Sequence, residues 1–325
     1  MKTAIVTGAG GFIGGAVTEL LLGKGITVYG VDVSEKSLER HRDRESFFPV
    51  IADFTKYGQL HEAIPAGADV FYHFAWQGVF GDAFREYRLQ LNNAAYAADA
   101  VREAVKLGCK KFVFAGTYNE LEVADHFDMS GKTPRYTCIY SAAKAAAEII
   151  CKTIAANQGI EYSAGLTVMA YGENNRSMML PNVVINQLID GTGPKLIKGD
   201  IPYDMIYIED IARAFYAIGE SGVNLRSYYV GHRELRTFHE YLTDIGAIVA
   251  PGVPLLFGAY PDDNSSRNYS MIDRDALYRD TGFECTSDFE ESIRKTAAWL
   301  ENERKAEEMK IVKNGNGGGQ QEVNT

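Results

Sequence analysis

The stretch KTAIVTGAGGFIG, residues 2–14, decides the fold of this chain. An apolar run, residues 4–6, ends at Thr7, and four glycines then lead into an apolar segment that continues to Leu22. This order predicts a strand, a tight turn and the start of a helix. Such a turn leaves backbone N–H groups and the positive end of a helix free to bind a pyrophosphate. Directly after a predicted strand, the pattern indicates a dinucleotide site.

An acidic residue stands where a ribose-binding carboxylate is expected. The next predicted strand, residues 26–31, ends at Asp32, which lies 18 residues beyond Gly14. That spacing is close to the separation of about 20 residues seen in dinucleotide-binding folds. A carboxylate accepts hydrogen bonds from ribose hydroxyls and repels a 2′-phosphate, so we expect NAD(H) to be preferred over NADP(H).

The composition is that of an ordinary globular protein. The 325 residues are 46% hydrophobic and 23% charged, enough for one large domain with a smaller lobe. The net charge of −10 disfavours nucleic acid or an anionic membrane as a partner. No apolar run is long enough to span a bilayer, and the first residues do not resemble a signal peptide. The four cysteines lack metal-like spacing, so we expect reduced thiols, no metal and a cytoplasmic location.

Strand-like and helix-like segments alternate over the first half of the chain. This alternation predicts an α/β fold of the Rossmann type, a doubly wound parallel sheet with helices on both faces. Further strands are expected at residues 49–53, 69–74, 111–115 and 162–169, with helices between them. Ligands of such sheets lie beyond the carboxyl ends of the strands. Those ends carry Gly8, Asp32, Asp53, Ala75 and Thr117.

The alternation loosens after residue 172. We therefore expect a Rossmann domain over residues 1–172 and a smaller C-terminal α/β substrate lobe over residues 173–306. Part of the lobe, near residues 206–218, is expected to return to the large domain. The glycine-rich residues 307–325 have almost no apolar periodicity, which predicts a disordered tail.

Tyr140 and Lys144 are the most informative pair for chemistry. They are four residues apart in an alanine-rich segment, which predicts that they share one face of a helix. A lysine one turn away places a positive charge near the phenol and is expected to lower its high pKa. Thr117, at the end of a predicted strand, could hold a carbonyl or alcohol oxygen. Tyr-x-x-x-Lys also occurs by chance on surface helices, but its combination with the glycine turn and Thr117 favours a hydride-transfer site.

At this point the sequence resembles the extended short-chain dehydrogenases/reductases of the NAD-dependent epimerase/dehydratase type, which act on nucleotide sugars. The matching pieces are residues 7–14 (TGAGGFIG), Asp32, Asp53, residues 73–75 (HFA), Asn93, Thr117, Tyr140 with Lys144, residues 171–172 and residues 199–210. The resemblance extends from residue 1 to about residue 300.

The resemblance implies a set of cofactor-binding residues. The pyrophosphate would lie against Gly8, Gly11, Phe12, Ile13 and Gly14. Asp32 would bind the adenosine ribose, and Asp53 with Phe54 would contact the adenine, although Asp53 could equally cap a turn. Ala75 would line the cofactor site and Asn93 would support the active-site backbone.

The resemblance also implies a catalytic set. Thr117 stands at the position of the family's catalytic serine or threonine, Tyr140 would be the acid/base, and Lys144 would bind the nicotinamide ribose and tune Tyr140. The segments 73–78 and 114–120 look most like those of enzymes that reduce 4-keto-6-deoxy nucleotide sugars. Trp76, Gln77 and Asn119 would then face the substrate, or Trp76 would simply pack beneath its loop.

The two residues after Thr117 narrow the choice of reaction. Dehydratases of the family carry Asp-Glu at that point, whereas this chain has Tyr118-Asn119 and lacks the carboxylates that remove water. Two reactions at C4 of a nucleotide sugar remain, which are epimerisation and net reduction of a keto sugar. Homodimerisation is implied by the resemblance, through residues 94–105 and 142–150.

Departures in the C-terminal half leave the substrate open. Tyr203 replaces the arginine usual in the family's Gly-Glu-x-x-Arg-Asp segment, and the later diphosphate-binding arginine has no clear counterpart. Arg176 and Arg267 are candidates to replace them, with solvated surface arginines as the alternative. Without such cations the substrate could be a smaller, non-nucleotide carbonyl compound. A non-catalytic dinucleotide-sensing protein is a third hypothesis, which the intact Thr117, Tyr140 and Lys144 set argues against.

Overall fold

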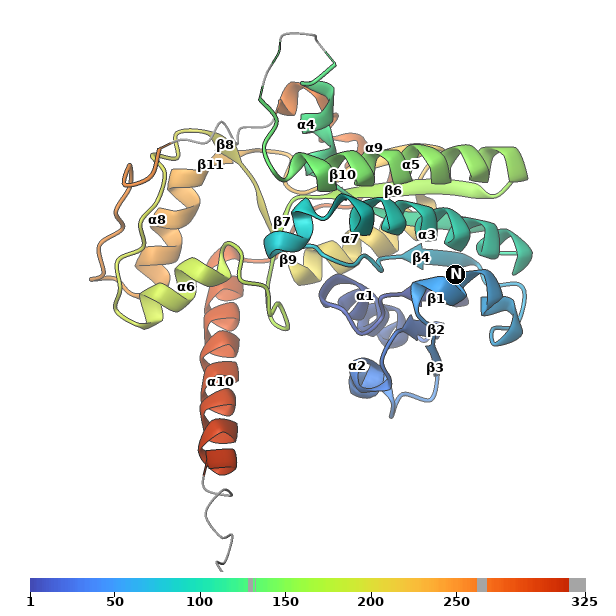
Figure 1. Ribbon diagram of the computed structural model, residues 1–325, viewed down its shortest axis with the longest axis horizontal. Coiled ribbons are helices and arrows are strands. Elements are labelled where there is room, and N and C mark those ends of the chain that lie inside the picture. Colours follow the sequence, from blue (N-terminus) through green and yellow to red (C-terminus); the bar gives the residue numbers. More distant parts are fainter. Residues whose placement is uncertain (128–130, 132, 262–267, 316–325) are drawn as a thin grey trace, which may run out of the picture. The chain divides into compact units, whose positions relative to one another are not determined.

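The computed structural model describes residues 1–127, 131, 133–261 and 268–315 (Figure 1). The chain divides into two compact units. The first contains the described residues of segments 1–170, 202–236 and 264–287, and the second those of segments 171–201, 237–263 and 288–325. No helix among the described residues is both long enough and apolar enough to cross a membrane.

A seven-stranded parallel sheet forms the centre of the first unit. Its strand order is β10-β6-β5-β4-β1-β2-β3. The strands are β1 (Thr3–Thr7), β2 (Thr27–Asp32), β3 (Phe47–Ile51), β4 (Val70–His73), β5 (Lys111–Thr117), β6 (Glu161–Thr167) and β10 (Arg226–Val230). Four shorter strands form two-stranded sheets and are β7 (Met169–Tyr171) with β9 (Met205–Tyr207) and β8 (Pro202–Tyr203) with β11 (Arg236–Thr237). The predicted doubly wound parallel sheet is confirmed.

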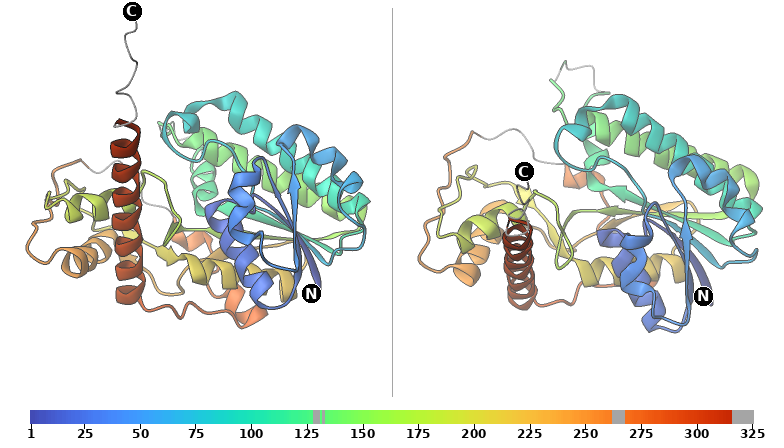
Figure 2. Two further views of the ribbon diagram at one scale, coloured as in Figure 1. Left: turned by 90° about the horizontal axis from the view of Figure 1, so that it is seen from below. Right: turned by 60° about the horizontal axis from the view of Figure 1, so that its bottom comes forward.

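Helices cover both faces of this sheet (Figures 1 and 2). They are α1 (Phe12–Gly23), α2 (Glu35–Leu38), α3 (Tyr87–Lys106), α4 (Leu121–Ala124), α5 (Cys138–Gln158), α7 (Ile208–Ser221) and α9 (Ala276–Thr281). The 3₁₀ helices are η1 (Glu39–His41), η2 (Phe54–Glu62), η3 (Gly81–Arg85), η4 (Tyr118–Glu120) and η5 (Tyr269–Met271). The pair α3 and α5 packs on one face, and the pair α1 and α7 on the other.

Small side chains let the helices approach closely. The buried face of α3 carries Ala97 and Ala100, and that of α5 carries Ala147 and Ala155, all fully buried. Alanine has high helix propensity and no bulk to hold two helices apart, so this composition favours both the helices and their contact. The apolar residues of the strands on which α3 and α5 pack, such as Phe112, complete one continuous core.

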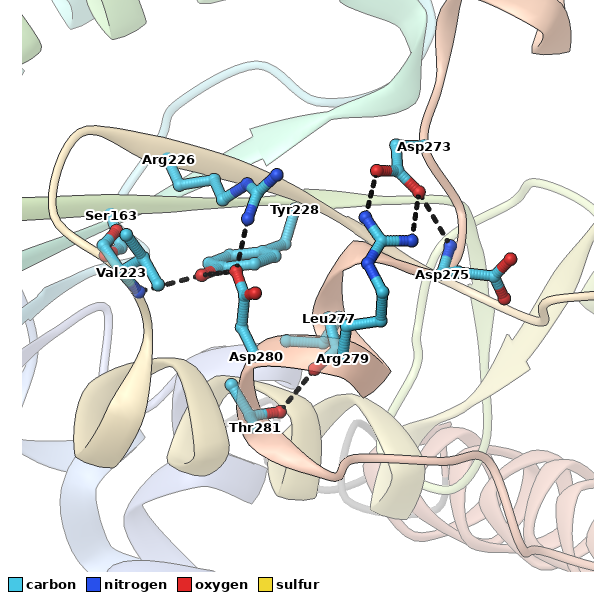
Figure 3. Close-up of polar contacts among 10 residues, drawn as sticks. All are labelled: Ser163, Val223, Arg226, Tyr228, Asp273, Asp275, Leu277, Arg279, Asp280 and Thr281. Carbon is cyan, nitrogen blue, oxygen red and sulfur yellow. Dashed lines mark hydrogen bonds and ion pairs between the residues drawn. The ribbon is translucent and has the colours of Figure 1, made fainter.

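Segment 264–287 rejoins the first unit at the outer strand of the sheet (Figure 3). Asp280 in α9 accepts hydrogen bonds from the Arg226 guanidinium at 2.7 Å and from the Tyr228 hydroxyl at 2.8 Å. The Tyr228 hydroxyl in turn accepts from the backbone N–H of Val223 at 2.7 Å. One carboxylate therefore fastens α9 to β10. The sequence predicted a return near residues 206–218, which lie in segment 202–236 of this unit, but not this later return.

The second unit is built mainly from three helices, α6 (Asn182–Ile189), α8 (Phe238–Val249) and α10 (Phe289–Gly315), which pack on one another. Thr237 caps α8, because its hydroxyl accepts from the Glu240 backbone N–H while the Glu240 carboxylate accepts from the Thr237 backbone N–H. The apolar side chains that these helices share include Ile185, Leu242 and Ile293, all fully buried.

Helix α10 continues beyond the point where the sequence predicted disorder. It extends to Gly315, so residues 307–315 of the expected disordered tail are helical. The helix continues from residues 289–306, where side-chain pairs such as Lys305 with Glu301 at 2.9 Å and Lys295 with Glu291 at 2.8 Å support it. Pairs with this i,i+4 spacing stabilise an exposed helix by a few tenths of a kcal/mol each, roughly. The rest of the predicted tail, residues 316–325, lies outside the described residues.

Candidate active site

The glycine turn connects β1 to α1 at the carboxyl edge of the sheet. Gly8 has φ +71°, which a residue with a Cβ rarely adopts. Its carbonyl accepts from the Gly11 N–H at 2.9 Å, and a Cβ at Gly14 would stand only 2.2 Å from the Gly8 oxygen. The turn is therefore tightly packed, and Gly14 must be a glycine because α1 passes directly against the Gly8 carbonyl at the end of β1.

The turn has the features of an anion site. Gly11 is the N-cap of α1 and makes no side-chain capping bond, so among the described residues no side chain caps the N–H groups of Phe12 and Ile13. Uncapped N–H groups at a helix N-terminus attract phosphate oxygens. The backbone of Ala75 lies against Gly8, since a Cβ on Gly8 would meet the Ala75 nitrogen at 3.0 Å. Binding of a pyrophosphate by these N–H groups remains a prediction.

Asp32 is tied to the glycine turn. One carboxylate oxygen accepts from the Gly10 N–H at 2.9 Å and the other from the Val33 N–H at 2.8 Å. Each carboxylate oxygen has a further lone pair, so both can still accept from a ribose diol. The carboxylate therefore both fixes the turn and presents negative charge at the end of β2.

Asp53 caps a turn. Its Oδ1 accepts from the Thr55 backbone N–H at 2.8 Å and from the Thr55 hydroxyl, and these bonds hold the pKa of the Asp53 carboxyl below its usual value. Of the two roles considered for Asp53, adenine contact and capping of a turn, the structure shows the capping role. Phe54 stacks on Tyr96, with ring centroids 5.2 Å apart. Contact of Asp53 and Phe54 with an adenine remains a prediction.

Thr117 ends β5 and begins η4 in a capping box. Its hydroxyl accepts from the Asn119 N–H at 3.3 Å, while the Glu120 carboxylate accepts from the Thr117 N–H at 2.7 Å. The same hydroxyl is also hydrogen-bonded to the Tyr140 phenol, a bond that acts to lower the pKa of Tyr140. The structure thus brings together the hydroxyls of Thr117 and Tyr140, which lie 23 residues apart in the sequence.

Tyr140 lies on the buried side of α5. Its ring packs edge-on against Trp76, with centroids 6.2 Å apart, and against Phe84, at 4.9 Å. Burial is the main reason that the pKa of Tyr140 is raised, and the nearby Glu120 carboxylate raises it further. The pKa of Tyr140 is therefore raised and not lowered as expected, because loss of water around the phenol and the Glu120 charge outweigh the bond to Thr117.

Lys144 shares the helix face with Tyr140 but points inward. Its ammonium donates to the Ala115 carbonyl at 2.7 Å and lies 3.9 Å from the centroid of the Trp76 ring. Burial lowers the pKa of Lys144 to about 8, while the Glu120 and Glu148 carboxylates act in the opposite direction. The ammonium is thus held beneath the site by a carbonyl and an aromatic face.

The loop after β4 is held by two amide side chains of α3. Trp76 donates its indole N–H to Gln90 Oε1 at 2.8 Å, so it packs under the loop as well as over Lys144. Asn93 accepts from the Gln77 N–H at 3.1 Å and donates to the Gln77 carbonyl at 2.8 Å. Asn93 therefore fixes the backbone at Gln77, which is the kind of contact the resemblance assigns to it.

Arg176 belongs to the second unit, where it pairs with Glu303 at 2.7 Å and lies over the ring of Trp299. Arg267 lies outside the described residues. Asn119 lies within η4, two residues after Thr117.

Two glutamates that the sequence motifs did not single out lie beside Lys144. Glu120 comes from η4 and Glu148 from α5, one helical turn beyond Lys144. Burial and the charge of Glu148 raise the pKa of Glu120 well above its usual value. The spacing of Tyr140, Lys144 and Glu148, four residues each, was the signal that could have found Glu148.

A cavity of about 440 Å³ opens where β10 ends. Its lining includes His232, Arg233, Arg274, Asp275 and Cys285. Arg233 is paired with Asp275 at 2.5 Å, and the Arg274 guanidinium donates to the Arg233 carbonyl at 2.6 Å. Its charges therefore largely neutralise one another, and no sequence motif indicated this cavity.

Comparison with known proteins identifies relatives of the whole arrangement. A family model described as the NAD dependent epimerase/dehydratase family matches residues 4–231. A dTDP-glucose 4,6-dehydratase of Shigella flexneri is 29% identical over 173 residues, and an uncharacterized protein, y4nG, of Sinorhizobium fredii is 26% identical over 246 residues. These matches cover 49% and 74% of this chain, and the chain spans only 46% and 59% of the two relatives.

Solved structures share the fold. The UDP-glucuronic acid 4-epimerase of Bacillus cereus in complex with NAD superposes with a TM-score of 0.74 at 18% identity, covering 93% of this chain and 99% of that one. The UDP-N-acetylglucosamine 4-epimerase of Methanobrevibacter ruminantium, in complex with UDP-N-acetylmuramic acid, gives 0.75 at 21% identity over 93% and 99%. The Bordetella bronchiseptica enzyme WbmF with NADH gives 0.77 at 18% identity over 96% and 95%.

Proposed function

We propose that this chain, which belongs to the NAD-dependent epimerase/dehydratase family, catalyses NAD(H)-dependent oxidoreduction at C4 of a nucleotide sugar. The observation that carries the proposal is the meeting of Thr117, Tyr140 and Lys144 at the carboxyl end of β5, on the same sheet edge as the glycine turn. The neighbours in fold include 4-epimerases bound to NAD, which supports the same class of reaction.

NAD(H) is the cofactor that the residues fit. Gly8, Gly11 and Gly14 allow the tight turn at the start of α1, where Phe12 and Ile13 would offer backbone N–H groups to the pyrophosphate. Asp32 would accept from the ribose hydroxyls, and its charge disfavours the 2′-phosphate of NADP(H). When bound, the nicotinamide supplies the hydride acceptor or donor.

The proton chemistry would be performed by Tyr140. Its phenol, hydrogen-bonded to Thr117, would give a proton to the ketone oxygen when C4 is reduced and take it back from the hydroxyl when C4 is oxidised. The raised pKa of Tyr140 keeps it protonated and ready as an acid. Lys144, whose ammonium is bonded to the Ala115 carbonyl, would bind the nicotinamide ribose.

Dehydration is not part of the proposal, although dehydratases are among the relatives. Removing water needs an acid and a base beside the reacting carbons. The residues after Thr117 are Tyr118 and Asn119, and the Glu120 carboxylate is turned back onto the Thr117 backbone.

Epimerase and reductase are separated by the fate of the cofactor. A reductase consumes NADH in proportion to product, whereas an epimerase turns over with a catalytic amount of NAD. The substrate should first be sought by a thermal-shift screen of nucleotide sugars with NAD(H) present, because a ligand that binds only the folded state raises the melting temperature.

Tyr140→Phe should then lower kcat by at least about 100-fold, the usual size of a general acid/base contribution. Tyr216→Phe, on the opposite face of the sheet, is the matched control; full turnover by Tyr140→Phe would contradict the mechanism.

A smaller carbonyl substrate is the second candidate. It is favoured by the placement of Arg176, which is already paired with Glu303, and by Tyr203 in place of the family's arginine. The diphosphate of a nucleotide sugar would then lack both Arg176 and the arginine that Tyr203 replaces. Stabilisation by small ketones but by none of the UDP-, dTDP-, CDP- or GDP-sugars would select this alternative.

Homodimerisation through α3 and α5 is also proposed. The outer faces of these helices expose Leu91, Ile149 and Ile150, with 56%, 66% and 42% of each residue accessible. Apolar residues that cluster on two packed helices suit a four-helix contact with a second copy. Light scattering should give twice the mass of 35.9 kDa, and Ile149→Arg should return it to the monomer value. A monomeric mass for the unaltered protein would reject the proposal.

A further inference from the structure

Tyr140, Lys144 and Glu148 form one stripe along α5. Residues four apart lie about 40° from one another around a helix, so three such residues face the same side. Tyr140 and Lys144 belong to the proposed chemistry, but Glu148 has no role in it. Its Oε1 accepts from the Ser227 hydroxyl of β10. Its Oε2 is buried and has no hydrogen-bond partner among the described residues.

A second carboxyl group approaches the same place from η4. An added Cβ on Gly116 would stand 2.8 Å from Glu120 Oε1 and 3.4 Å from Glu148 Oε2, so both carboxyl groups lie against this one glycine. Glu120 Oε1 is held there by the Thr117 N–H at 2.7 Å. The missing side chain of Gly116 leaves the space that the two carboxyl groups occupy.

The charges around this place do not balance if both carboxyl groups are ionised. Within the part of the chain that the structure describes, Lys144 is the single cation that faces the pair, and its ammonium is already bonded to the Ala115 carbonyl. The other titratable groups that face the pair are Tyr140, Cys151 and Tyr162, whose pKa values are all raised, so they are neutral at pH 7. Two carboxylates close together in a buried site cannot both ionise readily, and the usual outcome is one proton held between them.

We propose that Glu120 and Glu148 share one proton at neutral pH, so that the pair carries a single negative charge and balances Lys144 beneath Tyr140. The shared proton gives Glu148 Oε2 the partner it otherwise lacks among the described residues. Burial and the Glu148 charge, which raise the pKa of Glu120, act in the same direction. Glu120 and Glu148 are thus positioning residues, which act through their charge on Lys144 and, for Glu120, through its bond to the Thr117 backbone.

The pair would set the pH range in which Tyr140 works. The Glu120 charge opposes ionisation of Tyr140. When the shared proton is lost at high pH, a second negative charge appears beside the phenol and opposes its deprotonation. Oxidation of the C4 hydroxyl, which requires Tyr140 to accept a proton, should therefore stop rising with pH and level off once the shared proton is lost. This kinetic consequence rests on the proposed function, whereas the shared proton does not.

Infrared spectroscopy across pH tests the shared proton without any substrate. We expect the carbonyl stretch of a protonated carboxyl at pH 7 in the unaltered protein, and its loss in both Glu120→Gln and Glu148→Gln. Glu161→Gln, an exposed residue at the start of β6, is the control and should keep the band. Absence of the band in the unaltered protein at pH 7, or its survival in both variants, would overturn the proposal. Since the two glutamates lie on different elements, misfolding of one variant leaves the other to decide.

The pH profile tests the consequence. With the substrate found by the screen, the oxidation rate of the unaltered protein should level off at the pH where the shared proton is lost. In Glu120→Gln, which has no shared proton to lose, the rate should go on rising, to a roughly tenfold difference one pH unit above that point. Glu161→Gln should level off as the unaltered protein does. Levelling off in Glu120→Gln as well, or its loss in Glu161→Gln, would overturn the tuning of Tyr140. The proposed function fails instead if Tyr140→Phe keeps its activity, so the two failures are distinguishable.

Discussion

Replacing Gly14 by alanine should disable the cofactor turn while leaving the rest of the sheet intact. The added Cβ would stand 2.2 Å from the Gly8 carbonyl oxygen and 3.3 Å from the Phe74 Cβ. Ordinary contacts begin near 3.4 Å, so α1 and the turn must separate by about 1 Å. Overpacking of this kind lowers the free energy of unfolding by about 1–3 kcal/mol.

Helix α1 contains its own control. Gly23 lies in the last turn of the same helix, where an added Cβ would meet nothing within 4 Å. Gly23→Ala should raise the free energy of unfolding by up to about 1 kcal/mol, because alanine loses less backbone entropy in a helix. The two Gly→Ala variants therefore change stability in opposite directions, although the added group is the same.

The assay combines urea unfolding with calorimetric titration of NAD. Gly14→Ala should weaken NAD binding by about tenfold or more, if the strain of about 1.4 kcal/mol or more must be overcome in the bound turn. Gly23→Ala should bind NAD as the unaltered protein does. Equal NAD affinity in Gly14→Ala and the unaltered protein would refute the assignment of this turn to the cofactor, and equal stability would refute the packing argument.

Three carboxylates give further tests. Asp32→Ala should weaken NAD binding about tenfold, since charged hydrogen bonds contribute about 1.5–3 kcal/mol. When NAD and NADP are both titrated, the difference between their affinities should become smaller in this variant. An unchanged difference would contradict the role of Asp32 at the ribose. The Lys110 ammonium holds the pKa of Asp69 at about 2, below the ordinary 3.8. The stability that this carboxylate contributes is therefore present above about pH 4 and is lost as pH falls towards 2. In Asp69→Asn, the urea midpoint should not show this loss of stability between about pH 4 and pH 2. Asp280→Asn should lower the free energy of unfolding by about 1–3 kcal/mol, because the Tyr228 and Arg226 donors lose a charged acceptor; an unchanged urea midpoint would argue against this anchor.

The sheet could be predicted because its signals are local. Apolar runs such as residues 4–6 and 111–115 alternate with helical segments, and the rule that parallel strands end at one edge then places Gly8, Asp32 and Thr117 together. The glycine turn is equally local, since a left-handed φ at Gly8 and the contact of Gly14 with the Gly8 carbonyl need glycine at those positions. These features depend on neighbours in sequence or on the common geometry of all such sheets.

Features set by long-range packing could not be predicted. Segment 264–287 returns to β10 through Asp280, and nothing near Asp280 in the sequence indicates Tyr228 as its partner. The pKa of Tyr140 follows from its burial between Trp76 and Phe84, which the four-residue spacing to Lys144 does not reveal. Spacing predicts which side chains share a face, but solvation decides their charge.

The buried carboxyl pair shows where one more step from sequence was possible. Tyr140, Lys144 and Glu148 recur at a spacing of four, so a face predicted to carry one acid/base and one cation also had to carry an anion. A helix packed against a parallel sheet turns that face away from water, and an ionised carboxylate there requires a partner. Lys144 alone would satisfy Glu148, and the turn after Thr117 then adds Glu120, which leaves one negative charge too many. A proton shared by the two glutamates would remove that excess, so counting the charges of this helix face together with that of the turn after Thr117 leads toward the proposed arrangement.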